Sequence, residues 1–147
     1  MSLQGVEVGQ VLPEQSFGPV SMTDIVRYQG ASGDLIPLHH DDEFARAAGF
    51  PAAFSVGMLS AGWLASVVTD RFGETAVRRF GTRFTGIVYR GDVLTASGEV
   101  VGLTTDGESV AELELRLRNQ DGHVVVEGRA EVAVPPHHRA DGPGAGG

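Results

Sequence analysis

The sequence predicts an α+β domain in which a long buried helix is followed by antiparallel strands that wrap around it. Three observations lead to this fold class. Residues 55–72 have the length of a helix and are apolar on nearly every side, which is typical of a buried helix. From residue 79 onward, apolar and polar residues alternate with the period of a strand. Tight-turn sequences separate the alternating stretches.

Length, composition and charge restrict the classes of protein to consider. The chain has 147 residues, the size of one domain, and 41% of them are hydrophobic, which is enough for a core. The net charge of −8 argues against a nucleic-acid partner, and the absence of cysteine excludes disulfides and thiolate chemistry. The sequence shows neither a signal peptide nor an apolar stretch long enough to cross a membrane. We therefore expect a cytoplasmic protein without a membrane partner.

The first half of the chain predicts an extended arm and three helices. The first twenty residues contain glycines and prolines and predict a loose strand or arm. Ser21 or Thr23 can cap a short helix after it. Asp41 or Asp42 can cap a second short helix, because acidic residues favour the positive end of a helix dipole. Ser55 is the expected N-cap of the long buried helix.

The second half predicts a sheet. Four stretches alternate in polarity, namely residues 79–89, 92–103, 110–118 and 123–134. We expect them to be neighbours in an antiparallel sheet with one buried face. Residues 1–135 would form the single domain, and residues 136–147 a disordered C-terminal tail, because that tail is too polar and glycine-rich to build a core. A sheet of this kind leaves an open edge and a half-covered helix, so we expect a homodimer or a larger assembly.

The stretch SGDLIPLHHDDEFA mixes apolar residues with aspartates and histidines in an unusual way for a surface loop. Asp34 and His39 stand five residues apart, and Pro37 between them stiffens the chain. We expect Ile36 and Leu38 to pack into the core while the two polar side chains point to one spot. A carboxylate and an imidazole that share a water molecule form a general acid–base pair.

The start of the long helix supplies a second element. The amides of Val56 and Gly57 fall where helix N–H groups have no acceptor inside the helix. A glycine there lets a substrate carbonyl approach the backbone, and the amide and the helix dipole would stabilise negative charge on its oxygen. Together with a water held by Asp34 and His39, this arrangement can add water across a conjugated double bond.

These residues resemble a known family. The segment YQGASGDLIPLHHDDEFARAAGF, followed by GMLSAG, is similar to the MaoC-like dehydratases, the (R)-specific enoyl-CoA hydratases of the hotdog superfamily. Their signature runs from a tyrosine through Ser-Gly-Asp-x-Asn-Pro-[Ile/Leu]-His to an aspartate and an alanine, and then to His-Gly-Met-Leu. The resemblance extends over about residues 20–102. The matching positions are Tyr28, Ser32, Gly33, Asp34, Pro37, Leu38, His39, Asp41, Ala45, Gly57, Met58 and Leu59.

The resemblance implies a fold, a reaction and a site. It implies a hotdog domain that hydrates trans-2-enoyl thioesters to (R)-3-hydroxyacyl thioesters, or dehydrates them in reverse, without a metal or other cofactor. Asp34 and His39 would be the catalytic dyad and the Gly57 amide the oxyanion donor. The substrate would be an acyl thioester of CoA or of acyl carrier protein. The expected substrate-binding residues are Ser32, Ile36, Ser55, Val56 and Met58.

Two positions depart from the family signature. Ile36 takes the place of the usual asparagine, and Val56 takes the place of the histidine before Gly-Met. Both changes put an apolar side chain beside the dyad. They leave open a second interpretation, in which the chain is one subunit of a heteromeric dehydratase that needs a second hotdog chain. A third interpretation is a hotdog acyl thioesterase, which would direct a carboxylate and a water at the thioester carbonyl.

Simpler interpretations apply to single residues. Alone, Asp34 would be an ordinary turn residue and His39 a buried structural histidine, and their register with the proline favours catalysis. A metal site built from adjacent residues, His39 to Asp42, is disfavoured because adjacent side chains diverge. Four arginines can either bind CoA phosphates or solvate a face of the sheet. They are Arg78, Arg79, Arg83 and Arg90.

Overall fold

The computed structural model describes residues 5–136. It contains five strands, three α-helices and two short 3-10 helices within these residues. In chain order they are β1 (Gln15–Phe17), α1 (Met22–Ser32), η1 (Pro37–His39), α2 (Asp42–Ala47), α3 (Gly57–Phe72), η2 (Glu74–Ala76), β2 (Val77–Phe84), β3 (Leu94–Thr104), β4 (Val110–Arg118) and β5 (Val124–Ala133).

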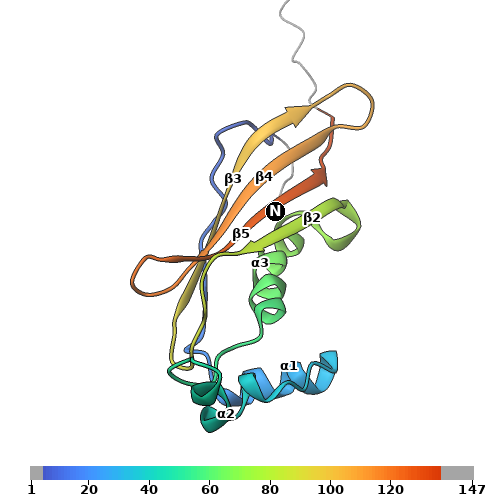
Figure 1. Cartoon of the computed structure of the whole chain (residues 1–147). Coiled ribbons are helices and arrows are strands. Elements are labelled where there is room, and N and C mark those ends of the chain that lie inside the picture. The colour runs from blue at the N-terminus through green and yellow to red at the C-terminus, as the bar shows by residue number, and fades with distance from the viewer. Residues whose placement is uncertain (1–4, 137–147) are drawn as a thin grey trace, which may run out of the picture.

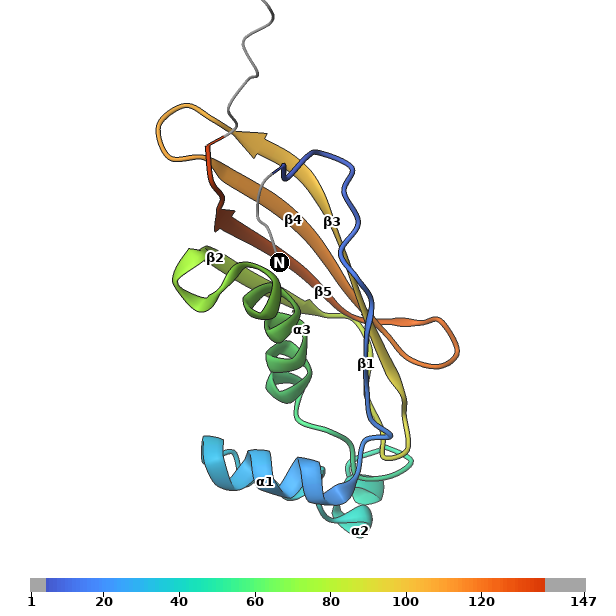
Figure 2. The same ribbon diagram turned by 180° about the vertical axis from the view of Figure 1, so that it is seen from behind.

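The strands form one antiparallel sheet in the order β1-β3-β4-β5-β2, and α3 packs against one of its faces (Figure 1, Figure 2). This is the predicted α+β hotdog arrangement. The expectation that strands adjacent in the chain are neighbours in the sheet is correct for β3, β4 and β5 but wrong for β2. That strand does not pair with β3 and lies instead at the far edge, against β5. Its outer edge is open in the single chain.

Alternation within the strands explains the core. In β4, every second side chain is fully buried, and these residues are Ala111, Leu113, Leu115 and Leu117. They face α3, which contributes Leu64 to the same core. Gly128 of β5 permits the close approach of the helix, because a Cβ atom at this position would stand 2.9 Å from a side-chain carbon of Leu64. The glycine is therefore required by packing.

The start and the burial of α3 differ from the prediction. The N-cap is Val56, which makes no side-chain capping hydrogen bond, so the expected capping role of Ser55 is wrong. The helix is also not buried on all sides. Met58 and Gly62 are exposed, because the sheet covers only one side of the helix in the single chain. The polar groups of the first turn are thus left without a cap.

The helices α1 and α2 lie together near the N-terminal end of α3 (Figure 1). Ser21 caps α1 through a capping box with Asp24, and Asp41 caps α2 by accepting hydrogen bonds from two backbone amides, which confirms both expected caps. No helix within residues 5–136 is long and apolar enough to cross a bilayer. Apart from Pro136, the expected C-terminal tail lies outside the described residues.

Candidate active site

The loop between α1 and α2 carries the predicted dyad. Helix α1 ends at Gly33, whose φ of 79° is accessible to glycine at little energetic cost. Pro37 then opens η1, in which the amide of His39 donates to the carbonyl of Ile36 at 3.2 Å. Ile36 itself is 49% exposed, so the expectation that it packs into the core is wrong. The turn of η1 directs the histidine inward and leaves the isoleucine at the surface.

His39 is buried and held in a defined orientation. Its Nδ1 lies 2.8 Å from the carbonyl oxygen of Phe54, and its ring packs edge-on against the Phe54 ring, with centroids 5.2 Å apart. A carbonyl oxygen only accepts hydrogen bonds, so Nδ1 carries a proton. In the neutral imidazole, Nε2 then presents a lone pair.

Asp34 faces that second nitrogen. Its Oδ2 lies 3.8 Å from His39 Nε2, which is beyond the usual range of a direct hydrogen bond, and the carboxylate is 44% exposed. The amides of the loop orient this residue, because its backbone N–H points to the hydroxyl of Ser32 at 3.3 Å. The structure therefore brings Asp34 and His39 together as expected, with the aspartate on the solvent side.

A cavity of about 190 Å³ lies next to the histidine and reaches the start of α3. Of the expected site residues, His39, Ser55 and Gly57 line it, whereas the other five lie outside its lining. These five are Ser32, Asp34, Ile36, Val56 and Met58. The walls are largely apolar and aromatic, from Phe54, Phe84, Ile87, Val88 and Val126.

Three features of this cavity concern the start of α3. Gly57 stands in close contact with Phe84, because a Cβ atom at Gly57 would lie 3.2 Å from the Phe84 ring. Ser60, one turn further along the helix, also lines the cavity. The hydroxyls of Ser55 and Ser60 are buried and have no hydrogen-bond partner within the described residues. Buried polar atoms and an uncapped helix start thus meet beside the histidine.

Comparisons with known proteins bear on this geometry. Residues 5–121 match the family model of the MaoC like domain. The chain belongs to the MaoC-like family. It is 33% identical to the (R)-specific enoyl-CoA hydratase of Rhodospirillum rubrum over 119 residues, which cover 79% of this chain and 81% of that protein. It is 32% identical to the (R)-specific enoyl-CoA hydratase of Aeromonas caviae over 143 residues, covering 92% of this chain and all of the relative.

Solved structures agree with this membership of the MaoC-like family. The (R)-hydratase from A. caviae involved in PHA biosynthesis superimposes with a TM-score of 0.80 at 29% identity, covering 90% of this chain and 99% of that one. A chain of the ChsH1-ChsH2 complex from Mycobacterium tuberculosis superimposes with a TM-score of 0.77 at 30% identity, covering 89% of this chain and 100% of the other.

Sequence reasoning missed Gln29 in this MaoC-like chain. The side chain of Gln29 in α1 is only 2% exposed, and its Nε2 donates to the carbonyl oxygens of Asp34 and Ile36 at 2.9 and 3.1 Å. It thus binds the backbone of the loop at two points, the aspartate itself and the residue two positions later. No spacing rule connects a glutamine on a short helix to a loop five residues later, so the sequence offered no signal for it.

The residues after His39 are each held by a different protein group. His40 Nδ1 lies 3.0 Å from Gln29 Oε1, and Asp41 caps α2. Asp42 accepts the backbone amide of Ala53 and a hydrogen bond from Arg90, and both interactions lower the pKa of its carboxyl group. No cluster of three or more potential ligands within residues 5–136 is arranged to hold a metal ion.

The arginines considered for CoA phosphates are mostly engaged elsewhere. Arg90 pairs with Asp42 at 2.7 Å, and Arg78 pairs with Glu108 at 2.6 Å, which raises the pKa of the guanidinium. Arg79 lies 3.6 Å from a carboxylate oxygen of Glu131. These pairs favour the interpretation in which the arginines solvate the surface of the sheet.

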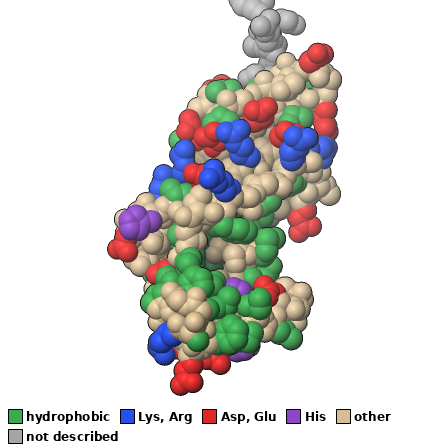
Figure 3. Space-filling view, viewed as in Figure 1, with side chains coloured by type: hydrophobic (Ala, Val, Ile, Leu, Met, Phe, Trp, Pro, Cys, Tyr) green, Lys and Arg blue, Asp and Glu red, His purple; other side chains and the backbone are tan. Residues whose placement is uncertain are grey.

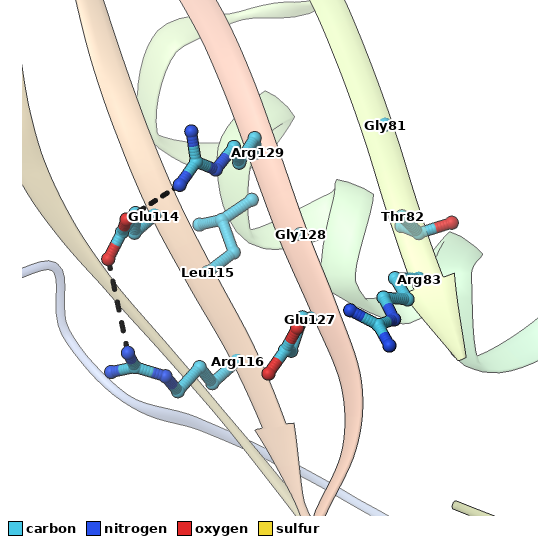
Figure 4. A pocket seen from close by; sticks show the side chains of 9 residues that line it. All are labelled: Gly81, Thr82, Arg83, Glu114, Leu115, Arg116, Glu127, Gly128 and Arg129. Atoms are coloured by element: carbon cyan, nitrogen blue, oxygen red, sulfur yellow. Dashed lines mark hydrogen bonds and ion pairs between the residues drawn. The ribbon is translucent and has the colours of Figure 1, made fainter. Parts of the chain in front are cut away.

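A larger hollow, of about 590 Å³, lies on the opposite face of the sheet and contains none of the expected site residues (Figure 4). Glu114 and Arg116 alternate with the buried leucines of β4, and Glu127 and Arg129 alternate with buried residues of β5, so these charged side chains point away from α3. They neutralise one another, as in the pair of Glu114 with Arg129 at 3.2 Å. Figure 3 shows acidic and basic side chains gathered over the sheet, while hydrophobic side chains are prominent toward the end that carries α1 and α2, with some acidic and basic side chains at its tip. Of these two cavities, only the smaller one is lined by expected site residues.

Proposed function

We propose that this chain catalyses the (R)-specific hydration of trans-2-enoyl thioesters and the reverse dehydration of 3-hydroxyacyl thioesters. One observation carries the proposal: the imidazole of His39 is fixed by Phe54 so that Nε2 faces the carboxylate of Asp34 beside an apolar cavity. The relatives named (R)-specific enoyl-CoA hydratases support it, since they match most of this chain. The chain is accordingly a hydro-lyase.

Asp34 and His39 would hold the reacting water between them. Their separation of 3.8 Å is long for a direct contact and leaves both groups available to the same water molecule. In hydration, the water oxygen bonds to the β-carbon while the dyad takes one of its protons. The dyad also delivers a proton to the α-carbon, so the addition is complete and the two side chains return to their starting state.

The start of α3 would hold the thioester carbonyl. The amide of Gly57 opens a helix of 16 residues that no side chain caps, so its N–H and the helix dipole are available to an oxygen that becomes negative. The hydroxyl of Ser55 lies in the same cavity and can bind the substrate. Ser32, Ile36 and Met58 are exposed outside the cavity, and their side chains would meet the thioester or its carrier, whereas the side chain of Val56 is buried in the core and does not reach it.

The substrate would be an acyl thioester, carried on either CoA or acyl carrier protein. The relatives called enoyl-CoA hydratases favour CoA, whereas others are 3-hydroxyacyl-[acyl-carrier-protein] dehydratases. Both carriers present the same thioester to the dyad. The apolar walls of the cavity suit an aliphatic acyl chain.

A second hotdog chain would complete the assembly. The outer edge of β2 is open, and apolar side chains such as Met58 and Phe84 remain exposed near it. The similarity to a chain of the ChsH1-ChsH2 complex supports pairing with another hotdog subunit. We expect residues 1–135 to form the domain that pairs. The expected partner is a second copy of this chain, and the alternative to be tested is a different hotdog chain.

The decisive experiment offers the purified chain short, medium and bulky trans-2-enoyl-CoAs and follows the loss of enoyl absorbance. Free thiol is measured in parallel, because a thioesterase releases thiol without hydrating the double bond. Hydration without thiol release is the expected result. Thiol release alone would replace the proposal with a thioesterase, and activity only after addition of a second hotdog chain would establish a heteromeric enzyme.

A further inference from the structure

We infer that Gln29 is a positioning residue for Asp34, and that it supplies from α1 the amide that position 36 lacks. The inference rests on the proposed function, because it concerns how the proposed dyad is held. It begins from the burial of a polar side chain: Gln29 is 2% exposed on a short helix outside the cavity. A buried amide is stable only when its hydrogen bonds are made.

All the hydrogen-bonding atoms of this amide are engaged by the catalytic loop and its neighbour. Nε2 has two hydrogens, and it donates them to the carbonyl oxygens of Asp34 at 2.9 Å and Ile36 at 3.1 Å. Oε1 accepts from Nδ1 of His40 at 3.0 Å. The Gln29 side chain thus binds the backbone of the loop at Asp34 and at Ile36, and it also binds the side chain of His40.

The loop has few other constraints on the aspartate. The amide of Asp34 is 3.3 Å from the hydroxyl of Ser32, and the amide of Ile36 is 3.5 Å from the Asp34 carboxylate, which is at the limit of a hydrogen bond. Ile36 has no polar side-chain atom that could hold the turn. The two bonds from Gln29 are therefore the shortest hydrogen bonds to the backbone at these two positions.

The two backbone carbonyl oxygens fix which way the Gln29 amide faces, and His40 then lies on the side of its oxygen. An amide can rotate by half a turn and exchange its oxygen and nitrogen, which here would place the oxygen against two carbonyl oxygens. The Nδ1–H of His40 holds the oxygen on the other side.

The test compares Gln29→Leu with Gln29→Leu/Ile36→Asn, Ile36→Asn and the matched control Gln120→Leu. Gln120 is an exposed glutamine whose side chain binds Val93 and Asp92, which lie outside the loop that carries Asp34. Its replacement therefore removes a hydrogen-bonded amide but leaves the hydrogen bonds of that loop intact. Initial rates of enoyl-CoA hydration give kcat and KM, and thermal melting gives the folded state of each variant. His40→Ala is included as a milder change that leaves Gln29 in place.

For Gln29→Leu we expect kcat to fall by about tenfold to a hundredfold, because displacement of a catalytic group by about 1 Å has an effect of this size. KM should stay within about twofold, since the substrate pocket is not altered. An asparagine at position 36 should restore part of the lost kcat in the double variant, measured against Gln29→Leu. Gln120→Leu should keep the wild-type kcat.

Other results would overturn the inference. A Gln29→Leu protein with wild-type kcat would show that the amide does not position Asp34. A loss of activity that follows the loss of folded protein, without rescue by Ile36→Asn, would reduce Gln29 to a structural residue. If Gln29→Leu does not fold, His40→Ala decides, with a lower kcat at an unchanged melting temperature expected and an unchanged kcat contradicting. A wild-type chain that hydrates no substrate, either alone or with a second hotdog chain, would instead overturn the proposed function itself.

Discussion

Among the single residues, His39 is central to the proposed chemistry, and its two ring nitrogens have different partners. The carbonyl oxygen of Phe54 accepts the hydrogen bond from Nδ1–H, so Nε2 is the nitrogen available to a water shared with Asp34. The backbone that carries Phe54 is itself tied down, because the amide of Ser55 donates to the carbonyl of Val88 at 2.7 Å. The histidine is therefore held by a rigid partner.

Asp34→Asn tests the carboxylate directly. The substitution keeps the shape of the side chain but removes its charge and its ability to take a proton, so we expect kcat to fall by about 10²- to 10⁴-fold. Because Asp34 is partly exposed, the melting temperature should change little. His39→Ala should give a loss of similar size, and the double variant should be hardly worse than either single one. Additive losses would mean that the two residues do not act on one water.

The sequence contained enough information for these two residues but not for their neighbours. The spacing of Asp34, Pro37 and His39 is local, and the turn it predicts is the turn that forms. The exposure of Ile36 could not be predicted, because it depends on how η1 turns the chain beside α1. Gln29 was missed for the same reason, since its hydrogen bonds follow from the packing of a helix against a loop.

Among the helices, α3 begins without a side-chain cap and contains a buried hydroxyl that has no hydrogen-bond partner within residues 5–136. Local propensity favoured Ser55 as the cap, but its amide is bound to Val88 and its side chain faces the cavity instead. Tertiary contacts therefore move the helix start to Gly57. This departure from a local rule occurs at the proposed oxyanion site, where function and stability make different demands.

Ser60→Ala should stabilise the fold. Ser60 is buried with an unpartnered hydroxyl, and burying such a group without a hydrogen bond costs about 1–3 kcal/mol. Ser66→Ala is the matched control on the same helix, because that hydroxyl donates to the carbonyl of Trp63 at 2.6 Å. Both variants gain helix propensity, so we expect a higher free energy of unfolding for Ser60→Ala than for Ser66→Ala in urea titrations. The opposite order would show that Ser60 is satisfied.

Asp42 ties α2 to the connection between β2 and β3. The amide of Ala53 and the guanidinium of Arg90 lower its pKa from the ordinary 3.8, so the ionised form is favoured in the folded state. Its contribution to stability is therefore complete above the ordinary pKa and is lost as the pH falls through the lowered value. We expect Asp42→Asn to melt earlier than wild type at neutral pH and the gap to close below about pH 4. A gap that persists in acid would exclude the charge as its cause.

The matched control for this measurement is Asp106→Asn. Asp106 lies in the exposed turn between β3 and β4, and none of the hydrogen bonds or ion pairs found within the described residues involves its side chain. Its melting temperature should follow that of wild type over the whole pH range.

Over the whole molecule, the single chain leaves one side of α3 and one edge of the sheet uncovered. The sheet covers one side of α3, and β2 offers an unpaired edge over its whole length. The strand patterns predicted this incompleteness, since alternation shows which face is buried. They did not predict that β2 pairs with β5, because strand order depends on how the connection after β2 crosses the molecule.

The assembly state provides a test of this incompleteness. We expect light scattering to give twice the 15.4 kDa of one chain. Gly62 is exposed on α3, and a Cβ atom there meets nothing in the single chain, so Gly62→Lys should fold normally. If a second chain covers this side of α3, the lysine should shift the protein to the monomer. A dimer that tolerates the lysine would place the interface elsewhere.

An (R)-specific hydratase adds water to only one face of an enoyl thioester. The most direct measurement is chiral analysis of the 3-hydroxyacyl product that the wild-type chain forms from a trans-2-enoyl-CoA, with Asp34→Asn as the blank. We predict the (R) isomer alone, formed at least about 100-fold more slowly by Asp34→Asn. An (S) product, a mixture of both isomers, or an undiminished rate in Asp34→Asn would contradict the proposed function.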